Sequence, residues 1–128
     1  MTDTVQLTDS RRLTGANLYW HKPAAIIDCA GTGDLQPFID RWRQAAAALL
    51  PQVGHSAESM TFRVFDGGAS LLISAPIDAL YSMCELNEAA FARACGESDD
   101  EAETVQRLRA AFAQESNPPL LALQAAAA

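Results

Sequence analysis

The chain has 128 residues, of which 49% are hydrophobic and 20% are charged. That length suits one domain with a hydrophobic core and is too short for two, and the composition excludes wholesale disorder. The formal net charge is −7 and is unevenly placed: the residues up to Phe65 carry six basic and six acidic side chains, whereas those from Asp66 onward carry three and ten. Because a surface of this sign repels phosphate backbones, we expect no nucleic-acid partner.

The cysteines and the N-terminus indicate a reducing, non-membrane location. Cys29, Cys84 and Cys95 are odd in number and form no CxxC pair, which argues against a disulfide framework or a zinc site. The opening MTDTVQLTDS has neither the basic nor the apolar region of a secretory signal. No apolar run approaches the roughly 20 residues that span a bilayer. We therefore expect a cytoplasmic protein that does not enter a membrane.

The first third of the chain predicts an arm and two strands. The polar residues 1–10 are expected to form a flexible N-terminal arm, so that the folded domain covers 11–116. Short strands are predicted over 17–20 and 24–30, with Pro23 breaking the pattern between them.

A helix is predicted to follow, with Asp34 as its N-cap. Pro37 falls in its first turn, where a missing N–H is tolerated, and Pro51 and Gly54 are expected to end it. Its apolar residues recur at helical spacing and predict one buried side. They are Leu35, Phe38, Ile39, Trp42, Ala45, Ala46 and Leu49.

A β-hairpin is predicted over 60–74, because Asp66-Gly67 is typical of a type I′ turn between two β-rich runs. This turn sets a register in which apolar pairs share one face and the remaining pairs share the other. The pairs on the first face are Val64–Ala69, Phe62–Leu71 and Met60–Ile73, and those on the second are Arg63–Ser70 and Thr61–Leu72.

Three helices are predicted in the last part of the chain. The first runs from Pro76 to about Cys95, with Gly96 as its C′ residue, and its expected buried side is Ile77, Leu80, Tyr81, Cys84 and Phe91. The second follows a capping box over 98–101, with Ala102, Val105, Leu108 and Phe112 facing inward. The third begins within 117–128 and shows no C-cap, which suggests that it leads into further domains.

These elements predict an α+β fold in the order ββαββααα. We expect two layers, in which a four-stranded, mostly antiparallel sheet carries the helices on one face.

Two surface clusters are candidate sites. Asp78, Glu85 and Glu88 share a side of the helix after Pro76, next to Tyr81, and together could cradle a guanidinium or ammonium group. The alternative is an ordinary polar helix face, with Glu88 satisfied by Arg63 or Arg93. A second, docking cluster consists of Arg11, Arg12, Asn17 and Trp20, which could hold a carboxylate or the acidic surface of another domain. Its alternative is an edge strand carrying charges that prevent aggregation.

Other chemistry has weaker support. The strand, Gly31-Thr32-Gly33 and helix resemble a dinucleotide loop only superficially, because a third glycine is missing and Asp34 would repel a phosphate. His21 and His55 have no partner at ligand spacing. Cys29 at a strand end is the best available nucleophile, but the sequence places no base to activate it.

Four segments carry a family resemblance. The run from Asp9 to Trp20, DSRRLTGANLYW, is similar to the opening of the N-terminal domain of cyanophycin synthetases and their Mur-ligase-type relatives, with its Arg-x-x-Gly-x-Asn core. The runs GGASLLISAPIDALY, over 67–81, and ELNE, over 85–88, resemble the hairpin and central helix of that domain. NPPLLAL, over 117–123, resembles the segment leading out of it.

The resemblance implies a module without catalysis of its own. In that family the N-terminal domain precedes ATP-dependent amide-ligase domains, and it is associated with assembly and with holding the growing amino-acid polymer. ATP and Mg²⁺ would then belong to downstream domains of the same polypeptide, because this chain lacks a Gly-Lys-Thr phosphate loop. The expected partners are those domains, a cationic peptide or amino-acid polymer, and a second copy in a homo-oligomer.

One departure from the family bears on metal binding. Some members carry a His-x-x-Glu-His metal motif at the start of the central helix, where this chain has Ala75, Asp78 and Ala79. Without the imidazoles we expect no metal site and no peptide cleavage. Two rival hypotheses stay open: a stand-alone protein-interaction module without ligase domains, and a small hydrolase acting through Cys29.

Overall fold

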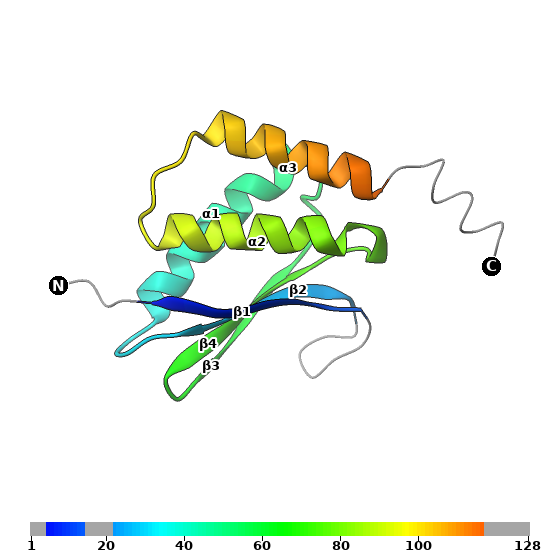
Figure 1. The fold of residues 1–128 in the computed structure, drawn as a ribbon. Coiled ribbons are helices and arrows are strands. Elements are labelled where there is room, and N and C mark those ends of the chain that lie inside the picture. The colour runs from blue at the N-terminus through cyan, green and yellow to red at the C-terminus, as the bar shows by residue number, and fades with distance from the viewer. Residues whose placement is uncertain (1–4, 15–21, 117–128) are drawn as a thin grey trace.

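The computed structural model describes residues 5–14 and 22–116. Within them the chain forms a sheet, three α-helices and a short 3₁₀ turn, which confirms the predicted α+β class (Figure 1). In chain order they are β1 (Gln6–Leu13), β2 (Ala24–Ala30), α1 (Gln36–Gln52), β3 (Met60–Phe65), β4 (Gly68–Ser74), η1 (Ile77–Ala79), α2 (Leu80–Ala94) and α3 (Glu101–Glu115). The helix predicted within 117–128 lies outside the described residues.

The four strands form one antiparallel sheet in the order β1-β2-β4-β3. The hairpin of β3 and β4 has the predicted register, with Val64 opposite Ala69 and Met60 opposite Ile73. The predicted turn type is wrong, because a type I′ turn needs positive φ at both central residues and here only Gly67, with a φ of 87°, has it. Asp66 has a negative φ, so the turn follows the type II pattern, which also favours glycine at its second central position. Alternation of side chains then sends one face of β2 and β4 into the main core and leaves Leu72 with Ala24 and Ile26 on the opposite face.

The prediction of a flexible arm over 1–10 is wrong for residues 6–10, because they belong to β1 and pair with β2. Most side chains of this edge strand are exposed, so it lacks the apolar alternation that announces a half-buried strand. The register also shifts between Leu7 and Asp9. The strand predicted over 17–20 lies outside the described residues.

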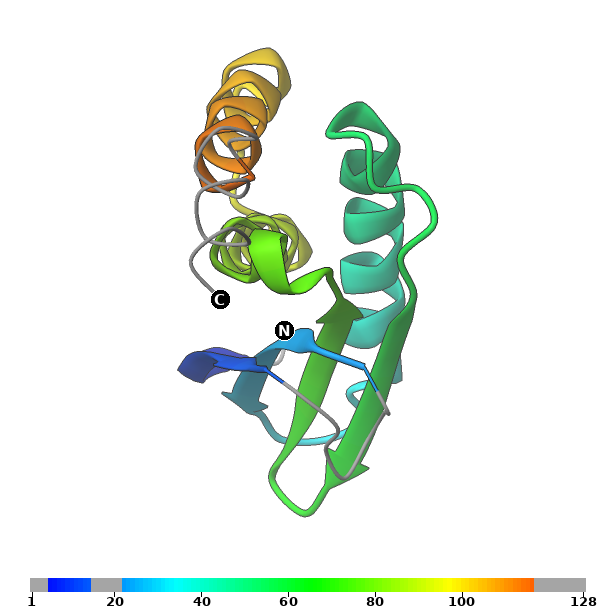
Figure 2. The same ribbon diagram turned by 90° about the vertical axis from the view of Figure 1, so that its right-hand side faces the viewer.

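All three described helices lie on one side of the sheet, as predicted (Figure 2). α1 and α2 pack beside each other over the strands, and α3 lies over α2 on the side away from the sheet. α1 begins close to the predicted position, but its N-cap is Leu35 and not the predicted Asp34. The Asp34 carboxylate still accepts a hydrogen bond from the Gln36 N–H, at 3.0 Å. Pro51 does not end α1 but occupies its last turn, and the chain leaves the helix after Gln52.

The predicted buried side of α2 is partly wrong. Ile77 and Tyr81 are 67% and 63% exposed, and Cys84 is half-buried. The reason is the 3₁₀ turn η1, which delays the start of the α-helix to Leu80. A 3₁₀ turn has fewer residues per turn than an α-helix, so the side chains that follow point in other directions around the helix axis than an α-helix from Pro76 would give them. The buried residues of α2 are Leu80, Ser82, Met83, Leu86, Asn87, Ala90, Phe91 and Ala94. Gly96 has the positive φ expected of a C′ residue.

α3 is capped two residues later than predicted. Asp100 is its N-cap and accepts from the Glu103 N–H at 3.2 Å, so the capping side chain is an aspartate and not Ser98. This shift exposes Ala102 and buries Thr104, while the predicted Val105, Leu108 and Phe112 are buried as expected.

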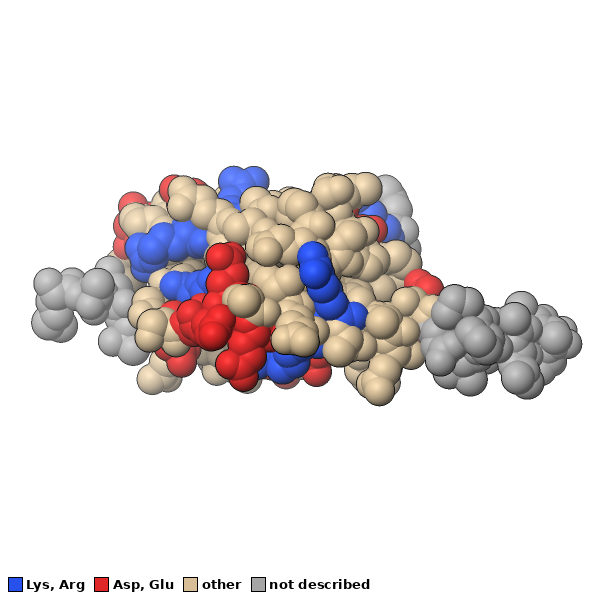
Figure 3. Space-filling model, turned by 90° about the horizontal axis from the view of Figure 1, so that it is seen from above, with Lys and Arg blue, Asp and Glu red and all other residues tan. Residues whose placement is uncertain are grey.

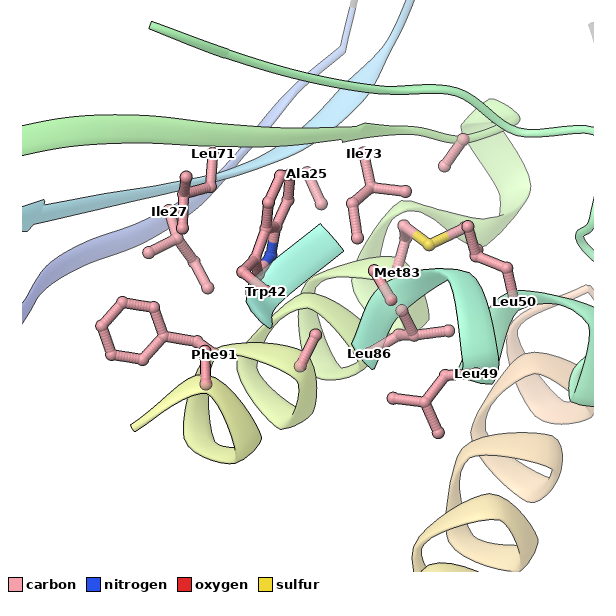
Figure 4. Close-up of a cluster of buried hydrophobic side chains, with 14 of the residues drawn as sticks. Ala25, Ile27, Trp42, Leu49, Leu50, Leu71, Ile73, Met83, Leu86 and Phe91 are labelled. Carbon is pink, nitrogen blue, oxygen red and sulfur yellow. The ribbon is translucent and has the colours of Figure 1, made fainter. Parts of the chain in front are cut away.

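A buried tryptophan joins the layers. Trp42 of α1 lies between the sheet and α2, surrounded by apolar side chains from both (Figure 4). Its indole N–H donates to the Asn87 side-chain oxygen at 2.7 Å, and both residues are fully buried. The Asn87 amide nitrogen lies 3.2 Å from the Leu71 carbonyl oxygen and 3.5 Å from that of Ala25. One polar pair therefore ties α1 and α2 to β2 and β4.

Candidate functional site

Three of the predicted binding residues lie along the exposed side of α2. Tyr81, Glu85 and Glu88 are exposed, and Asp78 is half-buried in η1 just before them. Tyr81 and Glu85 are four residues apart, so their side chains are neighbours on the helix. The acidic face expected from the sequence is therefore present at the surface, with an accessible aromatic ring near its start.

Strand β1 brings a cation to this face. Ser10 and Arg12 pair with β2 residues whose side chains enter the core, so their own side chains point to the face that α2 covers. The Arg12 guanidinium carbon lies 3.7 Å from the centroid of the Tyr81 ring, a cation–π contact. The Ser10 hydroxyl donates to the Glu88 carboxylate at 3.0 Å. Arg12, predicted as a docking residue, thus belongs to the same site as the predicted binding residues.

Arg11 belongs to the opposite face of the sheet. Its guanidinium forms ion pairs with Asp28 and with Asp9, the latter at 2.8 Å, and Asp28 also accepts from the Ser70 hydroxyl at 2.7 Å. The hydrogen bond to Asp28 raises the pKa of Arg11 despite partial desolvation. Because neighbouring residues of a strand point to opposite faces, the sequence pair Arg11-Arg12 is divided between two surfaces. Asn17 and Trp20, the other predicted docking residues, lie outside the described residues.

Glu115 completes the site, although nothing in the sequence pattern indicates this role. Its carboxylate, in the last turn of α3, accepts hydrogen bonds from the backbone N–H groups of Tyr81 at 3.0 Å and Ser82 at 2.7 Å. These N–H groups belong to the first turn of α2, so a side chain distant in sequence caps that helix. Beside it lies a surface depression of about 320 Å³. Its lining residues are Tyr81, Ser82, Glu85, Ala111, Gln114 and Glu115.

We expect Glu115→Ala to lower the free energy of unfolding by about 1 kcal/mol, because two N–H groups at the start of α2 lose their acceptor. Glu115→Gln keeps an acceptor oxygen and should lose less. Urea denaturation followed by circular dichroism measures both, with Gln114→Ala as a control on the exposed side of the same turn. Equal stability of Glu115→Ala and the parent would show that the cap contributes nothing.

The pKa of Cys84 shows whether the electrostatic field at the site is positive or negative, because this thiol lies among the charged groups of the site. Burial and, to a smaller extent, the Glu88 carboxylate raise the pKa of the Cys84 thiol to about 11, while Arg12 opposes this change. Glu115 and Glu85 add smaller effects in the same direction as Glu88. The site is therefore electronegative in balance, and at neutral pH Cys84 is a thiol and not a nucleophilic thiolate.

The other candidate chemistry finds little support in the geometry. Cys29 is buried against the Ala69 carbonyl oxygen, and burial raises the pKa of its thiol, which disfavours a nucleophilic role. The His55 ring stacks on Phe112 with centroids 4.6 Å apart, as a packing residue would. Among the described residues, no group of three or more His, Cys, Asp and Glu side chains is placed to hold a metal ion. No described helix is both long and apolar enough to cross a bilayer.

A second acidic surface lies over the start of α3 (Figure 3). Here the Arg93 guanidinium pairs with Asp99 at 3.2 Å and with Glu101 at 3.3 Å. A hydrogen bond from Thr104 and the contact with Arg93 lower the pKa of Asp99. These carboxylates are thus partly neutralised by Arg93 and, at a helix N-terminus, favourably placed in the helix dipole, which accounts for them without a ligand.

Comparison with protein-family models, with curated proteins and with solved structures gives no significant match to this chain. The site on α2 is therefore interpreted from its own geometry.

Proposed function

We propose that this chain is a binding domain that performs no catalysis itself and holds cationic side chains of a peptide or amino-acid polymer on the exposed side of α2. The acidic residues Glu85, Glu88 and Glu115 and the Tyr81 ring offer what a guanidinium or ammonium group requires: carboxylates for charge and an aromatic face for stacking. The chain's net charge of −7 favours the approach of such a partner.

The observation that carries the proposal is the contact between Arg12 and Tyr81. A guanidinium of the chain itself lies over this ring at 3.7 Å, in the neighbourhood of three carboxylates. Guanidinium groups are weakly hydrated and stack readily on aromatic rings, so an arginine from another molecule can use the same chemistry. The adjacent depression offers space for such a side chain beside Glu85 and Glu115.

The biological setting that we propose follows from the family resemblance. Of the segments similar to cyanophycin-synthetase-like proteins, those over 67–81 and 85–88 lie in the β3–β4 turn, β4, η1 and α2, and part of the run over 9–20 lies in β1. The resemblance therefore includes elements that carry the site. In this proposal the domain serves an ATP-dependent amide ligase of that Mur-ligase-related type, as its N-terminal substrate-holding or docking domain. ATP and Mg²⁺ would be bound by the ligase domains.

The test is the affinity of the chain for a tetra-arginine peptide, measured by calorimetry at low and high ionic strength. Glu85→Gln with Glu88→Gln should weaken binding by about three- to thirtyfold at low salt, as expected for two exposed ion pairs, and by less at high salt. The matched control is Glu101→Gln with Glu103→Gln, which removes the same charge at the start of α3. Equal affinity of the parent and the Glu85/Glu88 variant for the peptide would show that the exposed side of α2 is not the binding face.

A further inference from the structure

Arg12 is held at the site by a contact that another cation can replace. Among the described residues, no carboxylate lies within ion-pair distance of its guanidinium, and its described contact is the face of the Tyr81 ring. By contrast, the neighbouring Arg11 is fixed by two ion pairs. An exposed cation–π contact is weak, so Arg12 can leave the ring at little cost.

Arg12 also has the charge of the expected ligand. Three carboxylates raise the pKa of the Cys84 thiol and Arg12 lowers it, which places this cation and the carboxylates Glu85, Glu88 and Glu115 around the same point. While Arg12 is in place, it covers one face of the aromatic ring and reduces the negative field. Both effects oppose the binding of a second cation.

We infer that Arg12 is an internal competitor for the α2 site, an arginine of the chain that occupies the Tyr81 ring until an arginine or lysine of a cationic polymer displaces it. This inference rests on the proposed function, because it assumes that the site accepts a cationic ligand. It adds that binding is an exchange of one guanidinium for another. Binding of a ligand to the α2 site would thereby also change the contacts of β1, since Arg12 lies near the C-terminal end of that strand.

The first test compares the affinities of variants for tetra-arginine. Arg12→Ala should bind about two- to fivefold more tightly than the parent, the factor expected from removing an exposed cation–π competitor. Arg63→Ala is the matched control: it removes the same charge from the opposite face, at the other edge of the sheet, and should change the affinity much less. Weaker or unchanged binding by Arg12→Ala, or an equal gain in both variants, would overturn the inference.

The second test uses the parent chain and needs no substitution. The δ-protons of Arg12 should show an upfield ring-current shift in the free protein and return toward the shift of a free arginine as tetra-arginine is added. Binding that leaves these resonances in place would overturn the competition but keep the proposed function. Failure of the parent and of every variant to bind tetra-arginine would reject both.

Discussion

Gly68→Ala is expected to lower the free energy of unfolding by about 3 kcal/mol or more, the upper range for forcing extra volume into a packed site. Gly68 starts β4 between β2 and β3, and a β-carbon built there would lie 2.1 Å from the Cys29 carbonyl oxygen and 2.9 Å from a ring carbon of Phe65. The ring of Phe65 can move aside, but the Cys29 oxygen belongs to the backbone of a central strand. Relief therefore requires β2 and β4 to separate locally.

Gly67→Ala provides the control for Gly68→Ala, because it inserts the same methyl group one residue earlier. A β-carbon at Gly67 meets nothing within 4 Å, but the residue has a φ of 87°. Its cost should be the backbone strain alone, about 1–2 kcal/mol. Urea denaturation of both variants distinguishes the two causes. If Gly68→Ala were no more destabilising than Gly67→Ala, the close approach of the strands at this point would be wrong.

Trp42→Phe is expected to cost about 2–4 kcal/mol, more than the lost volume alone explains. Phenylalanine cannot donate the hydrogen bond that Trp42 gives to the Asn87 oxygen at 2.7 Å, and that oxygen is fully buried. An unpaired polar atom at this position has no access to water. The measurement is the urea midpoint with circular dichroism, which does not depend on the fluorescence of the substituted residue.

A double-mutant cycle with Asn87→Leu separates the polar from the packing contribution. Asn87→Leu alone leaves the Trp42 N–H without its acceptor, whereas the double variant removes both partners. The double variant should therefore lose less stability than the sum of the single losses, by about 1 kcal/mol or more. Additive losses would show that the Trp42–Asn87 bond does not couple the two helices.

The sequence predicts most reliably where local chemistry and burial agree. The Asp66-Gly67 turn and the apolar alternation on either side demand the same register, and the structure has it. The stripe of α1 is similarly unambiguous, because Phe38, Ile39 and Trp42 are all buried.

The errors arise where tertiary contacts override the local pattern. β1 forms a strand because it can pair with the free edge of β2. The polar sequence of Gln6–Leu13 gives no sign of this pairing. In α2, Asn87 is polar yet fully buried because Trp42 and two strand carbonyls satisfy it, while Ile77 and Tyr81 are apolar yet exposed. Hydrophobicity alone therefore assigns the buried side of η1 and α2 only in part, with Leu80 and Phe91 predicted correctly.

In the candidate site, too, some contacts follow from the local sequence pattern and others depend on tertiary packing. Tyr81, Glu85 and Glu88 share a helix face, so their proximity follows from spacing alone. Arg12 and Glu115 reach them from β1 and α3, and only the packing of these elements on α2 reveals the contact. The pair Arg11-Arg12 looks like one basic cluster in the sequence, but the alternation of a strand places the two side chains on opposite faces.

The location of bound tetra-arginine tests the central claim, that the exposed side of α2 holds cationic side chains. Amide chemical shifts of the isotope-labelled chain should be recorded as the peptide is added. The account predicts the largest changes at Tyr81, Glu85, Glu88 and Glu115. Changes confined to the start of α3, around Glu101 and Glu103, or no saturable change anywhere, would contradict it.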